Sequence, residues 1–175
     1  MTFAHDGSPL QLLLQNSSVH FPDKTAIRKG QDISYAELQI LVQRAAAGFL
    51  SVGIEMTDRV AWLLPNCIEA VAVTFACYFI GAISVPINVR YSAEEIVWMI
   101  EKVRAKMLVL QHNNLSRVQQ QSCTLQELHL IIVDAWGQAS QYTTWDDFLR
   151  IAGAATLQPV KGDHGAIILF TSGTT

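Results

Sequence analysis

The chain contains 175 residues, of which 50% are hydrophobic and 15% are charged. That length suits a single domain with its own core, and the small share of charged residues predicts that much of the chain is buried. The net charge of −3, from 12 basic and 15 acidic residues without a basic cluster, argues against a nucleic-acid partner.

The cysteine content indicates a reducing environment. Cys67, Cys77 and Cys123 make an odd number, and no two of them form a C-x-x-C pair. This arrangement favours reduced structural thiols in a cytoplasmic protein over a disulfide framework or a zinc site. The first residues also lack the basic region that opens a secretory signal.

The first third of the chain contains the clearest helix signals. Ser8 precedes a proline and can cap a short helix, and a small hairpin is predicted around Gly30. Ser34 and Glu37 have the S-x-x-E spacing of a capping box, ahead of apolar residues at helical spacing. Gly53 stands where this helix would end in a left-handed residue.

Residues 70–89 carry no charge and would be long enough to span a membrane as one helix. Gly81 and Pro86 interrupt the stretch, and residues 83–87 have the pattern of a short strand. We therefore expect a buried helix followed by a buried strand, and no transmembrane segment.

Strand patterns alternate with helical ones through the rest of the chain. A second capping box, Ser92 with Glu95, opens one helix, and Thr144 opens another short one. Strands are predicted at residues 59–64, 83–87, 107–110, 129–133 and 166–170. Such alternation predicts an α/β fold with a mostly parallel sheet flanked by helices and joined by right-handed crossovers.

The last predicted strand runs into a tail rich in hydroxyl groups, Thr171-Ser172-Gly173-Thr174-Thr175. Ligands bind parallel sheets at the carboxyl ends of their strands, so chemistry is expected here. Gly173 lets the backbone approach a ligand closely, while hydroxyl and N–H groups can donate to phosphate oxygens. The tail is not a Walker A loop, and taken alone such a segment is more often an ordinary turn.

Five segments, in order and at familiar spacing, resemble the adenylate-forming (AMP-binding) superfamily, of the acyl-CoA synthetase or fatty-acid–CoA ligase type. They are FPDKTA at 21–26, ISYAEL at 33–38, DRVA through LPN at 58–66, FAC through VPIN at 75–88, and Asp163 through the TSGTT tail. The resemblance covers essentially the whole chain. It implies the N-terminal subdomain of an adenylate-forming enzyme.

The resemblance implies that residues 1–175 are the N-terminal part of the AMP-binding domain, cut within the phosphate-binding loop that Thr171 to Thr175 would begin. The implied reaction joins a small-molecule carboxylic acid to CoA, using ATP and Mg²⁺, through an acyl-adenylate. No residue here is expected to be catalytic or to bind metal, so the chain alone is expected to be inactive. Its apolar surface predicts self-association.

The sequence NVRYSAEEI at 88–96 resembles the N-x-R-x-(S/T)-x-E-E-(I/L) element of acyl-CoA ligases. This favours a fatty or other organic acid over an amino acid. The alternatives are an amino-acid adenylation domain and a non-catalytic nucleotide-binding or interaction module that reuses the fold. Two further pairs, Arg90 with Tyr91 and Asp163 with His164, are predicted to lie on the surface rather than in a site.

Overall fold

A computed structural model describes residues 10–29, 31–119, 128–134, 142–151, 160 and 163–171. In chain order the elements are α1 (Gln11–His20), β1 (Thr25–Lys29), β2 (Gln31–Ser34), α2 (Tyr35–Ser51), β3 (Arg59–Leu63), α3 (Ile68–Ile80), β4 (Ile83–Pro86), α4 (Ala93–Val103), β5 (Met107–Gln111), η1 (His112–Asn114), α5 (Leu115–Gln119), β6 (His129–Val133), β7 (Thr143–Thr144) and α6 (Trp145–Ile151). Strands and helices alternate along most of this part of the chain, which confirms the predicted α/β class.

Among the described residues, the main sheet has five strands in the order β4-β3-β5-β6-β7, and all of their pairings are parallel. Val60 of β3 pairs with Ser84 of β4 on one side and with Met107 of β5 on the other. A separate antiparallel hairpin joins β1 to β2, as predicted. Its turn residue, Gly30, lies outside the described residues.

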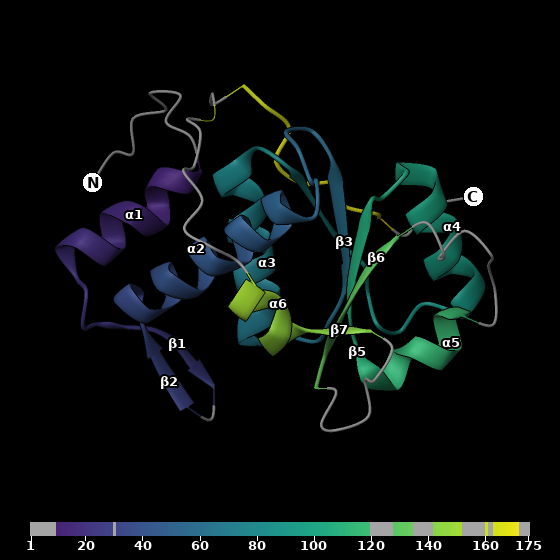
Figure 1. Ribbon diagram of the computed structural model, residues 1–175, viewed down its shortest axis with the longest axis horizontal. Helices are drawn as coiled ribbons and strands as arrows, with labels where there is room; N and C mark the ends of the chain where they lie inside the picture. The colour runs from purple at the N-terminus through teal and green to yellow at the C-terminus, as the bar shows by residue number, and fades with distance from the viewer. Residues whose placement is uncertain are drawn as a thin grey trace.

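Helices cover both faces of the sheet (Figure 1). On one face α2 packs against α3, with α1 and α6 beside α2, while α4 and α5 lie together on the other face. The β1–β2 hairpin extends from the helical layer that contains α1 and α2. This arrangement confirms a mostly parallel sheet flanked by helices.

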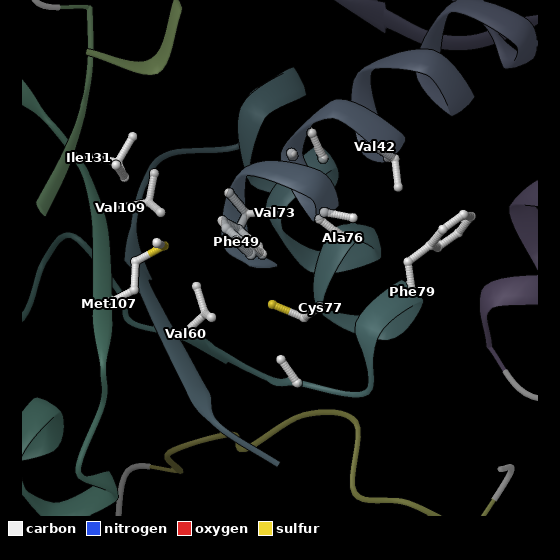
Figure 2. Close-up of a cluster of buried hydrophobic side chains, with 14 of the residues drawn as sticks. Val42, Phe49, Val60, Val73, Ala76, Cys77, Phe79, Met107, Val109 and Ile131 are labelled. Atoms are coloured by element: carbon white, nitrogen blue, oxygen red, sulfur yellow. The ribbon is translucent and has the colours of Figure 1, made fainter. Parts of the chain in front are cut away.

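The larger core lies between the sheet and the layer of α2 and α3 (Figure 2). Val60 and Met107 from neighbouring strands meet Phe49 of α2 and Cys77 of α3, and all four side chains are fully buried. Close packing of this kind leaves little room for substitution, and truncating a buried ring such as Phe49 typically costs about 3–5 kcal/mol.

A second core lies on the opposite face. Ala61 and Leu108, each next in sequence to a residue of the first core, pack there with Ile96 and Ile100 of α4. Successive side chains of a strand point to opposite faces, and both faces of this sheet are covered. The covered faces explain why β3 and β5 read as continuous apolar runs.

Capping boxes mark the starts of α2 and α4, and a glycine follows the end of α2. The Ser34 N–H donates to Glu37 Oε2 at 2.8 Å, and the Glu37 N–H donates to Ser34 Oγ at 3.2 Å. Ser92 and Glu95 exchange the same pair of bonds at 2.7 and 3.2 Å. Gly53, at φ +82°, follows the end of α2 in the left-handed conformation predicted for it.

The uncharged stretch at residues 70–89 divides as predicted into a helix and a strand. α3 ends at Gly81, whose φ of 73° is left-handed, and β4 begins two residues later at Ile83. Within the described ranges, no helix is both long and apolar enough to cross a membrane.

Three short elements, η1, α5 and β7, were not predicted from the sequence. They contain 3, 5 and 2 residues, too few for a periodic pattern to form. The first helix begins at Gln11, and its predicted cap, Ser8, lies outside the described residues.

Candidate functional site

Residues 163–171 run along the outer side of β4. The Ser84 N–H donates to the Ala166 carbonyl at 3.0 Å, and the Ile168 N–H donates to the Ser84 carbonyl at 2.9 Å. Ser84 and Ile167 thereby form an isolated parallel bridge. Because the segment is parallel to β4, its Thr171 end leaves the sheet at the carboxyl edge, where α/β folds bind ligands.

The predicted strand at residues 166–170 forms only in part, because this single bridge replaces a full ladder. Ile168 and Phe170 pack against the second core, whereas Ile167 and Leu169 are 42% and 63% exposed. Five consecutive apolar residues predict a regular strand here. The segment instead lies at the edge of the sheet, where described residues cover one face only.

The predicted phosphate-binding residues lie at and beyond the end of this segment. Thr171 is exposed and follows directly on Phe170. Ser172, Gly173, Thr174 and Thr175 lie outside the described residues, so their part in a phosphate site stays a prediction.

Ser84 links this segment to the body of the fold. Its side chain is fully buried, and its hydroxyl accepts a hydrogen bond from Trp62 Nε1 at 3.0 Å. The same hydroxyl lies 3.5 Å from Thr74 Oγ1, and Thr74 donates to the Ala70 carbonyl at 2.9 Å. These bonds satisfy a buried hydroxyl and join β3, β4 and α3 beside the bridge to Ile167.

The residue just before Thr171 is also fixed by a ring contact. Phe170 meets Trp98 of α4 at a centroid distance of 6.1 Å and an interplanar angle of 60°. Lys102, one turn along α4, lies with its ammonium 6.0 Å from the centre of the Trp98 ring. Trp98 is 55% exposed, so α4 presents an indole at the end of the extended segment.

Arg117 of α5 holds the loop between β4 and α4. Its guanidinium donates to the Val89 carbonyl at 2.9 Å and also to the Tyr91 carbonyl. Arg90, between these two residues, is exposed, and its N–H donates to Asn88 Oδ1 at 2.9 Å. No sequence pattern indicates this role of Arg117, because its partners lie 26 and 28 residues away.

The titratable groups near the segment form no dyad. Asp163 is exposed, and the structure records no hydrogen bond or ion pair between it and His164. His164 Nδ1 is buried and has no hydrogen-bond partner among the described residues. Across all the described residues, no group of three or more His, Cys, Asp or Glu side chains is placed to hold a metal ion.

The described cysteines are reduced and buried to different degrees. Desolvation by burial raises the pKa of Cys67 to about 11, and burial also raises the pKa of the fully buried Cys77 thiol. Both thiols are therefore protonated near neutral pH. Cys123 lies outside the described residues.

Proteins of known family have sequences similar to this chain. The chain matches the family described as AMP-binding enzyme over residues 14–175. It is 36% identical over 148 residues to the crotonobetaine/carnitine–CoA ligase of Escherichia coli K12, a match that covers 81% of this chain and 28% of that protein. The chain thus spans about 28% of the length of the curated relatives it matches.

Solved structures share the fold. The anthranilate CoA ligase AuaEII, in complex with anthranoyl-AMP, superimposes with a TM-score of 0.88 at 19% identity, covering 94% of this chain and 32% of that one. Coronafacic Acid Ligase from Pectobacterium brasiliense superimposes with a TM-score of 0.83 at 22% identity, covering 91% of this chain and 33% of that one. The N-terminal domain of FACL13 from Mycobacterium tuberculosis superimposes with a TM-score of 0.81 at 23% identity, covering 95% of this chain and 42% of that one.

The parallel sheet, its two helical layers and the segment leading to Thr171 define the fold of the N-terminal domains of adenylate-forming enzymes. With the family match over residues 14–175, the chain belongs to the AMP-binding enzyme family. The resemblance seen in the five sequence segments is thereby confirmed.

Proposed function

We propose that the protein takes part in the AMP-forming ligation of a carboxylic acid to CoA. The observation that carries this proposal is the 36% identity, over 148 residues, to a CoA ligase. In the first half-reaction a carboxylate oxygen attacks the α-phosphorus of ATP, and pyrophosphate leaves. The CoA sulfur then attacks the acyl carbon, AMP leaves with the bridging oxygen, and the thiol proton passes to solvent.

Thr171, Ser172, Gly173, Thr174 and Thr175 are proposed to hold the phosphate groups of ATP through hydroxyl and N–H donors. Their task is to position the nucleotide and to stabilise the departing pyrophosphate, so none acts as acid, base or nucleophile. Each such bond contributes about 1 kcal/mol, or roughly double to a charged oxygen. Residues 171–175 alone would therefore bind ATP with a Kd of about 1 mM at best, which corresponds to about 4 kcal/mol.

Magnesium is proposed to enter bound to ATP. The described residues form no cluster of acidic, His or Cys side chains that would hold an ion by themselves. Mg²⁺ commonly binds through substrate phosphates and water with one or two carboxylates, so a dedicated protein cage is not needed. Its chemistry there is to neutralise phosphate charge.

The acid is proposed to be a fatty or other organic acid rather than an amino acid. The NVRYSAEEI element supports this, as do the acids in the names of the relatives, which include crotonobetaine, carnitine, anthranilate and coronafacic acid.

The cysteines have no paired spacing, which supports a cytoplasmic location for the protein.

Residues 1–175 alone are proposed to form no acyl-adenylate, because they match only 28% of the length of the ligases. The test is acid-dependent exchange of labelled pyrophosphate into ATP, by this chain and by the product of the coding sequence read beyond codon 175. We expect a continuation Gly-x-Pro-Lys and exchange by the longer product only. A stop codon directly after Thr175, or exchange by the 175-residue chain, would contradict the proposal.

Substitutions in the longer product test the phosphate loop itself. Gly173→Val should raise KM for ATP at least about tenfold, a loss of about 1.4 kcal/mol, because a branched side chain blocks close backbone approach. Gly53→Ala is the control, because it replaces a glycine that has a left-handed φ of 82° but follows α2 and does not belong to the phosphate loop. An unchanged KM in Gly173→Val would place the nucleotide elsewhere.

A further inference from the structure

A cavity of about 390 Å³ lies between the β1–β2 hairpin, the end of β3 and the first turns of α3. Its lining residues are Ile27, Arg28, Trp62, Asn66, Cys67, Ala70, Val71, Thr74 and Phe75. None of them belongs to the segment that leads to Thr171. The volume falls within the range of about 300–1,000 Å³ that small-molecule sites occupy.

The walls of this cavity are mostly apolar and are held in place. Trp62 is fixed by its hydrogen bond to Ser84 at 3.0 Å. Phe75 meets the Tyr78 ring edge-on at a centroid distance of 5.6 Å and an angle of 71°. Ile27 and Val71, which also line the cavity, pack against the larger core. Walls that are already ordered lose little conformational entropy when a ligand enters.

The described polar side chains that line the cavity offer no unpaired charge. The Arg28 guanidinium is engaged by Asp32 at 3.3 Å, and the Cys67 thiol, half-buried, stays protonated at neutral pH. The Thr74 hydroxyl is already bonded to the Ala70 carbonyl. Among the described residues, the exposed carboxamide of Asn66 has no hydrogen-bond partner and so remains open to a ligand.

We propose that this cavity binds a small, neutral molecule with an aromatic ring and one hydrogen-bonding group. The ring would lie against Trp62 and Phe75, where flat apolar faces gain most from contact. The polar group would meet the carboxamide of Asn66. A carboxylate gains nothing here, because Arg28, the cation among the described lining residues, is already paired and its side chain is 81% exposed.

The probe is 2-naphthol, with 2-naphthoate as its anionic counterpart on the same ring. Each is titrated into the full chain labelled with ¹⁵N, and the indole N–H of Trp62 is assigned with Trp62→Phe. We expect saturable shifts at that N–H and along residues 66–75, and no tighter binding of 2-naphthoate. Shifts confined to other residues, or none that saturate, would overturn the proposal.

Filling the cavity gives the matched test. Val71→Trp adds a ring on the side of α3 that lines the cavity and should weaken 2-naphthol binding at least about tenfold. Ile40→Trp makes the same kind of change at a 52% exposed position of α2 and should leave affinity within about twofold. Cys67→Leu, one turn before Val71 at the start of α3, also fills the cavity and replaces Val71→Trp if that variant does not fold. Equal affinity in the filled and control variants would exclude the cavity.

The charge assignment has its own test in Arg28→Gln. This variant should bind 2-naphthol within about twofold of the wild type, because the guanidinium is engaged by Asp32. Tighter binding of 2-naphthoate by about tenfold, lost in Arg28→Gln, would show that the site takes anions and would overturn the neutral class. Neither result depends on the ligase reaction, since no nucleotide or CoA is present.

Discussion

The indole N–H of Trp62 on β3 donates to the hydroxyl of Ser84 on β4 across 3.0 Å, and this half-buried bond lies between the cavity and the edge segment, residues 163–171. The backbone of Ser84 holds residues 166–168, while its side chain holds one wall of the cavity. One small residue thus supports both features.

Removal of the Ser84 hydroxyl should destabilise the fold. Ser84→Ala leaves the Trp62 N–H without its partner, which costs about 1–2 kcal/mol in the free energy of unfolding. Trp62→Phe combined with Ser84→Ala completes a double-mutant cycle, and we expect a coupling energy of about 1 kcal/mol from urea unfolding. Strictly additive effects would show that the bond does not contribute.

Gly48 on α2 provides a test of the contact between α2 and α6. A Cβ there would lie 2.5 Å from Cζ of Phe148, so Gly48→Ala should cost about 1–3 kcal/mol by overpacking. Phe148→Leu in the same chain should recover part of that loss, as thermal unfolding would show. Gly53→Ala is the control, because a Cβ there meets nothing within 4 Å and its cost comes from φ alone. If Phe148→Leu adds its own cost in full, the contact is not the cause.

The capping box of α2 should make stability depend on acid pH. The hydrogen bonds from the Ser34 backbone and then its hydroxyl lower the pKa of Glu37 from its ordinary 4.5. A carboxyl whose pKa is lower in the folded state stabilises it above the unfolded pKa, and this contribution disappears as pH falls through the folded value. Urea midpoints from pH 6 to pH 3 should therefore fall further for wild type than for Glu37→Gln. Parallel curves would contradict the assignment.

The edge segment should promote self-association. Ile167 and Leu169 are exposed, and the N–H and C=O groups of Ile167 have no partner among the described residues. Open edges with apolar side chains readily pair with other chains, and a lysine on such an edge opposes this. Leu169→Lys should reduce the sedimentation-derived mass at tens of micromolar, whereas Leu13→Lys, at an exposed site on α1, should not. A monomeric wild-type chain would refute this expectation.

Local sequence signals predicted the helix ends and the alternation of elements well. Ser34 and Glu37 lie three residues apart, so their reciprocal bonds are present whenever that turn is helical. The left-handed glycines and the apolar runs of β3 and β5 act over equally short distances. The strand predicted at residues 166–170 forms only in part, because an apolar run does not show how many neighbours a strand will have.

The sequence by itself determined the α/β class, the family and the position of the hydroxyl-rich tail, because each rests on short patterns that can be recognised one segment at a time along the chain. Tertiary structure alone decided that Trp62 bonds Ser84, 22 residues away, and that Arg117 holds the loop around Tyr91. It also brought Ile27 to the same cavity as Phe75 and left Leu169 exposed at an edge. Such relationships arise from the packing of whole elements against one another, and that packing carries no local pattern from which it could be predicted.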